Sequence, residues 1–228
     1  MRIRPFLAAL LTTALVGPTA AVISTAAPAS AAESTRIVSA NSNTPWMYPG
    51  YRSQGKIPAV GETLSFSIDV KTASGADVYE GSVQVQFKPA GSSTWKTVAS
   101  SSGAYLYDNI KARQNGTYRA VYSGTSAYSA SSVSKTQKVQ RKLTTENIRG
   151  NRAGLKGKLS PKGKTKIVIQ KKSGKKWKGF RTQKTDKKGR FTIYLPAPRK
   201  GQFQWKITFK GNKKFAQTIV RGATKRGY

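Results

Sequence analysis

Apolar and polar residues alternate along much of the chain from residue 64 onward. The first run places Leu64, Phe66, Ile68 and Val70 at every second position, with polar residues between them. A second run over 83–87 follows the turn-rich segment 73–77. A period of two is typical of a strand with one buried face. The pattern therefore predicts two strands joined by a loop.

The second half of the chain shows the same alternation. Its apolar positions are Ile167 and Ile169, then residues 191, 193 and 195, then residues 203, 205, 207 and 209. No segment after residue 31 has a convincing helical period. Short strands between turns rich in Gly, Ser, Lys and Pro predict an all-β protein.

The two halves also share landmarks in the same order, which predicts two copies of one β unit. Both copies place a Gly four residues before an aromatic residue, at Gly124 and Tyr128 and again at Gly211 and Phe215. The remaining landmarks are segments 85–88 and 169–172, Trp95-Lys96 and Trp177-Lys178, and segments 116–124 and 201–211.

Several of these segments resemble a known family. Residues 61–64 and 118–132 are similar to the opening and closing strands of bacterial immunoglobulin-like repeat domains. Segments 157–161, 185–191 and 195–198 resemble the version appended to secreted bacterial surface proteins. The resemblance implies tandem β-sandwiches with a display or adhesion role, although the cysteine pair of antibody domains is missing.

The N-terminus reads as an export signal. Arg2 and Arg4 precede an apolar run over 6–16, and Ala29-Ser30-Ala31 fits signal-peptidase cleavage. Because a membrane span needs about twenty apolar residues, we favour cleavage over a retained anchor. We expect a signal peptide over 1–31 and sandwich domains over 32–138 and 139–228. We also expect a secreted protein that can associate with the cell wall and has no transmembrane segment in the mature chain.

The residue types present argue against most catalytic chemistry. The chain has no His and no Cys, which excludes an imidazole base, a thiol nucleophile and most transition-metal sites. A glycosidase would need a pair of carboxylates, and the eight acidic residues show no such pair. We therefore expect no enzyme activity, no metal and no cofactor, with a carboxylate hydrolase as the weakest alternative.

Charge is distributed very unevenly. Residues 139–228 hold 28 Lys and Arg against two acids, whereas residues 32–138 hold 11 against six. Such a surface attracts polyanions, although a merely solvated surface is the alternative. Because Lys outnumbers Arg, diffuse attraction is favoured over bidentate recognition.

The basic residues of the second half fall into two groups. One group surrounds the turns at Ser173-Gly174 and Asp186. The other would point outward from two strands that are neighbours in an immunoglobulin-like sheet. The predicted polyanion-binding residues are Lys166, Lys171, Lys172, Lys175, Lys176, Lys178, Lys184, Lys187, Lys188, Arg190, Lys206 and Lys210.

These observations predict a secreted, non-catalytic surface or adhesion protein. Its basic second domain would bind an anionic cell-envelope polymer or another polyanion by charge. Nonspecific binding of extracellular nucleic acid is an alternative, whereas sequence-specific recognition lacks a reading helix.

Aromatic residues suggest a second function. Trp46, Tyr48 and Tyr51 lie close together in a segment without alternation, and they could stack on a glycan in a carbohydrate-binding module. Packing over the end of the first sandwich is the alternative. We expect Trp95, Trp177 and Trp205 to lie in the core or to cover a sheet. Asn115-Gly116-Thr117 matches a glycan acceptor, but we favour a turn there.

Overall fold

The computed structural model describes residues 31–50, 57–148 and 152–226. These residues form sixteen β-strands and contain no helix, so the all-β prediction is confirmed. Residues 1–30 of the predicted signal peptide lie outside the described ranges. In the part of the chain that is described, no helix is long and apolar enough to cross a membrane.

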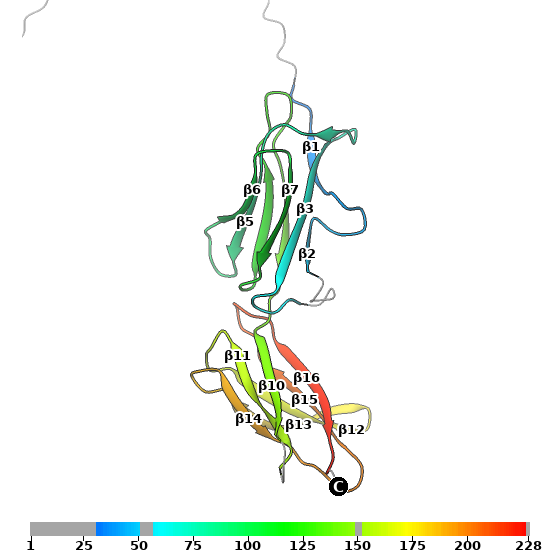
Figure 1. Cartoon of the computed structure of the whole chain (residues 1–228), viewed down its shortest axis with the longest axis vertical. Coiled ribbons are helices and arrows are strands. Elements are labelled where there is room, and N and C mark those ends of the chain that lie inside the picture. Colours follow the sequence, from blue (N-terminus) through cyan, green and yellow to red (C-terminus); the bar gives the residue numbers. More distant parts are fainter. Residues whose placement is uncertain (1–30, 51–56, 149–151, 227–228) are drawn as a thin grey trace, which may run out of the picture. The chain divides into compact units, whose positions relative to one another are not determined.

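Two antiparallel sheets make up the N-terminal half (Figure 1). The first has the order β1-β3-β2, and β4 and β7 also pair with β3. The second has the order β6-β5-β8-β9. Their strands are β1 (Thr35–Ser39), β2 (Met47–Pro49), β3 (Thr63–Thr72), β4 (Asp77–Val78), β5 (Val83–Pro89), β6 (Lys96–Ser101), β7 (Tyr105–Lys111), β8 (Gly116–Tyr122) and β9 (Ser131–Gln137).

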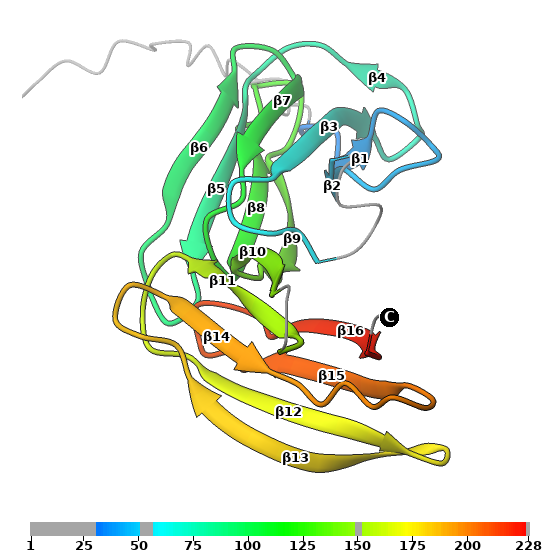
Figure 2. The ribbon, with the colours of Figure 1, turned by 60° about the horizontal axis from the view of Figure 1, so that its bottom comes forward.

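Two further antiparallel sheets make up the C-terminal half. One has the order β10-β11-β14, and the other has β13-β12-β15-β16, whose strands lie side by side in Figure 2. Their strands are β10 (Lys142–Ile148), β11 (Gly154–Ser160), β12 (Lys166–Ser173), β13 (Lys176–Lys184), β14 (Arg190–Tyr194), β15 (Phe203–Phe209) and β16 (Thr218–Thr224).

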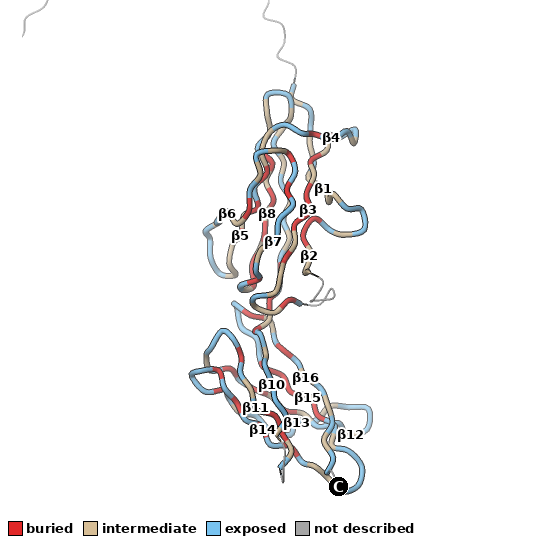
Figure 3. Tube along the Cα trace, in the orientation of Figure 1, coloured by how far each residue is buried: buried red, intermediate tan, exposed pale blue. Residues whose placement is uncertain are grey.

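Each half has its own hydrophobic core. Leu64, Ile68 and Val83 lie in the first core, and Ile167 and Ile207 lie in the second, all with an exposed fraction of 0%. Figure 3 shows buried residues recurring along the strands between more exposed ones. The period-two pattern is thus realised as one inward and one outward face for each sheet.

The four-stranded sheets of the two halves have corresponding strand orders, whereas the other sheet has five strands in the N-terminal half and three in the C-terminal half. The order β6-β5-β8-β9 matches β13-β12-β15-β16, and the pairing of β3 with β7 matches that of β11 with β14. Both four-stranded sheets also have a register shift at the same aligned position, between Val85 and Gln86 and between Ile169 and Gln170. The sequence landmarks therefore occupy equivalent places.

Backbone contacts confirm this correspondence at single residues. The Ser123 N–H donates to the Ser82 carbonyl at 3.0 Å, and the Lys210 N–H donates to the Lys166 carbonyl at 2.9 Å. A Cβ on Gly124 would approach the Tyr128 carbonyl to 2.8 Å, and one on Gly211 would approach the Phe215 carbonyl to 2.6 Å. Both glycines are therefore required by close backbone packing.

One detail of the sequence alignment is wrong. Register places Gly116 opposite Gln137 and Phe203 opposite Thr224, so Gly116 corresponds to Phe203 and not to Gly201. Gly116 has no room for a side chain, because a Cβ would lie 2.5 Å from the Lys88 carbonyl. Gly201 has open space around it and a φ of 73°, so it serves a turn.

Candidate functional site

The outward side of the β13-β12-β15-β16 sheet gathers basic side chains. Ile167, Ile169 and Ile207 are fully buried, so the residues between them on β12 and β15 face outward. Register pairs Lys166 with Lys184. It also aligns Lys206 with Arg221 on β16. We call this surface the basic face, and its members are Lys166, Lys172, Lys184, Lys206, Lys210 and Arg221.

The basic face has no acidic counterpart within its own sheet. Its four strands, all within the described residues, contain no Asp or Glu. Asp186 follows β13, and its carboxylate accepts a hydrogen bond of 2.7 Å from the Arg190 backbone N–H. Self-repulsion among the cations is therefore uncompensated within the sheet, which favours the approach of an anion.

Trp177 lies among these cations. Register pairs it with Lys172, and the Lys206 Nζ lies 5.3 Å from the centre of its ring. The ring is half-buried, unlike that of Trp205, which is 6% exposed in the core. A shallow hollow of about 360 Å³ adjoins Lys172 and is also lined by Gly174, Gln202 and Gln204. The expectation of core or sheet-covering tryptophans therefore holds, with a different role for each residue.

The equivalent face of the N-terminal half has two cations where the basic face has six. Register and backbone hydrogen bonds place serines where the C-terminal half has Lys166, Lys210 and Arg221, and the residue directly after β6, at the place of Lys184, is also a serine. Those serines are Ser82, Ser102, Ser123 and Ser134. Four of the six members of the basic face therefore replace a neutral hydroxyl residue on the same scaffold.

The two remaining positions are cationic in both halves and flank an equivalent tryptophan. Lys88 corresponds to Lys172, and Arg119 corresponds to Lys206. The Lys88 Nζ lies 4.7 Å from the Trp95 ring centre and the Arg119 Cζ lies 4.4 Å from it. Arg119 also donates a 2.7 Å hydrogen bond to Gln86. In the first half both cations make cation–π contacts with the Trp95 ring, which is a structural role.

The structure separates lysines that the sequence grouped together. The Ser173-Gly174 segment is a hairpin turn, as predicted, with Gly174 at a φ of 57°. Strand alternation puts Lys171, Lys176 and Lys178 on the opposite side of the sheet from Lys172, because Lys171 pairs with the buried Trp205. Lys175 lies in the turn itself.

The second predicted cluster also divides. Lys187 and Lys188 lie in the turn after β13, as predicted. Lys184 belongs to the basic face through its pairing with Lys166, and Arg190 lies on β14 in the other sheet. Arg221 was missed by the sequence analysis, because Gly222 and Ala223 obscure the alternation of its strand.

The outward side of the β10-β11-β14 sheet carries a second, weaker group of cations, of which sequence reasoning had named only Arg190. Lys158 pairs with Arg190, and Lys156 forms an exposed ion pair of 3.2 Å with Glu146. Lys142 completes this group at the end of β10. Because Glu146 offsets one charge, this surface has fewer unpaired cations than the basic face.

Of the aromatic residues expected to stack on a glycan, the structure describes Trp46 and Tyr48. Trp46 is only 8% exposed, and its ring stacks on Phe66 at 6.3 Å in the first core. Its burial matches the packing alternative and leaves little ring area for a ligand. Tyr48 is half-buried on β2, and Tyr51 lies outside the described residues.

Asn115 is a packed structural residue. Its side chain is 5% exposed, donates to the Lys213 carbonyl at 3.1 Å and accepts from the Val139 N–H at 2.8 Å. Both polar atoms are therefore engaged, which is incompatible with a glycan on Nδ2 in the folded protein. Strand β8 begins directly at Gly116, so the Asn-Gly pair is a bend before a strand and not a two-residue hairpin.

Within the described ranges, no group of three or more acidic residues could hold a metal ion. Comparisons with known proteins assign no family: no family model matches the chain, and no curated protein matches it significantly. The surface chemistry described above is therefore the basis for inferring a function.

Proposed function

We propose that this protein is a secreted, non-catalytic surface or adhesion protein that binds an anionic cell-envelope polymer through its basic face. In this proposal residues 1–31 are removed on export. Residues 32–138 and 139–228 form tandem immunoglobulin-like domains. The matching strand orders and the separate hydrophobic cores support the tandem arrangement.

The basic face carries this proposal. Six cations share one sheet face, and four of them stand where the equivalent face has serine. Solubility alone does not require this concentration of one charge, because mixed charges achieve it. A long anionic polymer can contact several of these cations at once, so that individually weak attractions add.

The test compares two variants that lower the net charge equally. The first replaces Lys166, Lys184, Lys210 and Arg221 with Ser, which gives these four positions the residue found in the first half and leaves two cations, as on the equivalent face. The control replaces Lys142, Lys156, Lys158 and Arg190 with Ser on the opposite sheet. Binding of each variant to isolated cell walls and to a soluble anionic wall polymer is measured over a salt series.

We expect the first variant to bind at least tenfold more weakly than the native protein. A cation facing an anionic surface contributes about 1 kcal/mol at physiological ionic strength. The control should lose much less affinity, and native binding should decline with salt because exposed charges are screened. Equal losses in both variants would show that net charge acts without a defined face. Binding that ignores salt would refute an electrostatic mechanism.

A further inference from the structure

Exposed tyrosines gather on the outward side of the β1-β3-β2 sheet, in the half without the basic face. Of the seven large apolar side chains that are exposed in the described residues, three lie here. Tyr79 is 75% exposed, Tyr105 is 51% exposed and Tyr107 is 63% exposed. Clustered exposed aromatic area is unusual on a protein surface and typically marks a binding site. We call these three residues the tyrosine surface.

Strand alternation and strand pairing place Tyr105 and Tyr107 on this surface. On β7, Leu106 points into the core with 2% exposure, so Tyr105 and Tyr107 both point outward. Pairing with β3 places Tyr105 opposite Asp69 and Tyr107 opposite Ser67. The two ring centres are 6.3 Å apart with an angle of 43° between the planes. The two rings thus lie next to each other along the outward side of β7.

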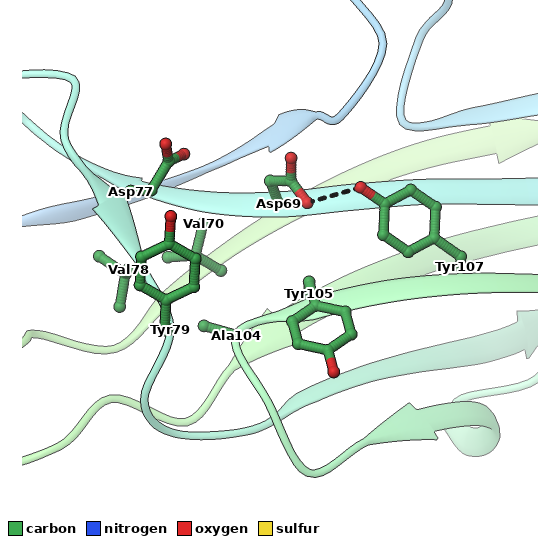
Figure 4. A pocket seen from close by; sticks show the side chains of 8 residues that line it. All are labelled: Asp69, Val70, Asp77, Val78, Tyr79, Ala104, Tyr105 and Tyr107. Carbon is green, nitrogen blue, oxygen red and sulfur yellow. Dashed lines mark hydrogen bonds between the residues drawn. The ribbon is translucent and has the colours of Figure 1, made fainter.

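A hollow of about 380 Å³ adjoins the tyrosine surface (Figure 4). Its lining combines the three tyrosines with apolar groups from Val70, Val78 and Ala104 and with the carboxylates of Asp69 and Asp77. This volume is within the range of small-molecule sites. The site therefore offers flat apolar surface and hydrogen-bond acceptors together.

The polar groups at the hollow are already oriented. The Tyr107 hydroxyl donates to the Asp69 Oδ1 at 3.1 Å, as the dashed line in Figure 4 shows. Burial raises the pKa of Tyr107 and the bond to Asp69 raises it further, which keeps the hydroxyl protonated. A carboxylate has about four lone-pair sites, so Asp69 can accept further hydrogen bonds from a ligand.

We propose that the tyrosine surface binds a neutral sugar ring of a polysaccharide. The C–H face of a pyranose can lie on an aromatic ring, while its hydroxyl groups donate to carboxylates. The two acidic residues disfavour an anionic ligand, so this site and the basic face select different chemistry. Binding here does not depend on the proposed function of the basic face.

A cationic ligand fits the geometry less well. The Lys71 Nζ lies 2.7 Å from the Asp77 Oδ1, so one of the two carboxylates already has a cationic partner. Recognition of a quaternary ammonium group uses aromatic faces that enclose one point. Tyr105 and Tyr107 extend side by side along β7 instead, which suits a ring within an extended chain.

The test measures retention of the purified protein on insoluble cellulose, chitin and mannan. Binding is measured in about 1 M NaCl, where the Debye length is about 3 Å and the basic face is screened. The variants are Tyr107→Ala, Tyr105→Ala and Asp69→Asn. Tyr194→Ala is the control, because Tyr194 is 45% exposed but lies on β14 in the other half.

We expect the native protein and Tyr194→Ala to be retained on at least one of the three polymers. Each tyrosine substitution should weaken that retention about five- to tenfold, as expected for an aromatic anchor. The exposed positions should leave thermal stability unchanged, which circular dichroism checks. Retention on none of the polymers would overturn the proposal. Retention that the tyrosine substitutions leave unchanged would also overturn it. So would release of the bound protein from the polysaccharide by added choline.

Discussion

The Lys206 ammonium lies 5.3 Å from the centre of the Trp177 ring, at the place where the N-terminal half has Arg119 at 4.4 Å from Trp95. Both pairs lie on the outward face of a four-stranded sheet, at equivalent register positions. The closer contact is also tied to Gln86 by a hydrogen bond of 2.7 Å. The cation–tryptophan contact is thus shorter in the N-terminal half than in the C-terminal half.

The contact between Arg119 and Trp95 should contribute more to stability than the contact between Lys206 and Trp177. We expect Arg119→Ala to lower the free energy of unfolding by about 1–2 kcal/mol, because it removes a cation–π contact and a hydrogen bond to a charged group. Lys206→Ala should change it by less than about 0.5 kcal/mol. Urea denaturation of both variants provides the comparison. Equal losses would contradict a structural role confined to the first half.

Salt dependence should report how many cations of the basic face meet a polyanion. With duplex DNA as the probe, each lost phosphate contact lowers the slope of log K against log salt by about 0.9. Replacing Lys166, Lys184, Lys210 and Arg221 with Ser should therefore reduce the slope by up to about 3.6. Fluorescence anisotropy at several salt concentrations measures this slope. An unchanged slope would show that these four residues do not contact the polymer.

Stability should decline in alkali because of Tyr118, which is 2% exposed in the first core. Burial raises the pKa of Tyr118 from 10.0 to about 12. Above pH 10 the unfolded chain loses this proton while the folded protein retains it, so stability falls as pH rises from 10 to about 12. The loss from this residue should reach about 2–3 kcal/mol.

Tyr118→Phe removes the titrating group and keeps the ring that packs on Phe66 and Phe87. Denaturation at several pH values between 8 and 12 compares the variant with the native protein. The variant should show a shallower decline above pH 10. An identical decline would assign the alkaline sensitivity to other groups, such as Tyr122, whose pKa is also raised by burial.

Asn115 should be intolerant of substitution. Asn115→Ala removes the partners of the Val139 N–H and the Lys213 carbonyl. The Val139 bond is buried, and an unsatisfied buried group costs about 1–3 kcal/mol. We expect a clear fall in melting temperature, measured by circular dichroism. Thr117→Ala is the matched control, because it also removes the sequon but affects an outward hydroxyl. Equal destabilisation by both substitutions would contradict the role assigned to Asn115.

Local sequence patterns were sufficient to predict the all-β class and the inward faces of the main strands. The reason is that a period of two is a property of the strand itself, and Leu64, Ile167 and Ile207 each show it within a few residues. The charge imbalance and the absence of His and Cys are likewise properties of composition. They limit the available chemistry before any strand is paired.

Tertiary structure decided which side chains share a surface. Lys171 and Lys172 are neighbours in sequence, but alternation and pairing with Trp205 put them on opposite sides of the sheet. Trp46, which precedes β2, is buried against Phe66 of β3, and Tyr105 and Tyr107 meet Asp69 because β7 pairs with β3. Such groupings depend on long-range strand pairing and register, which no local pattern contains. The sequence by itself determined the strands and their charge, and the pairing of those strands assembled the two candidate binding surfaces.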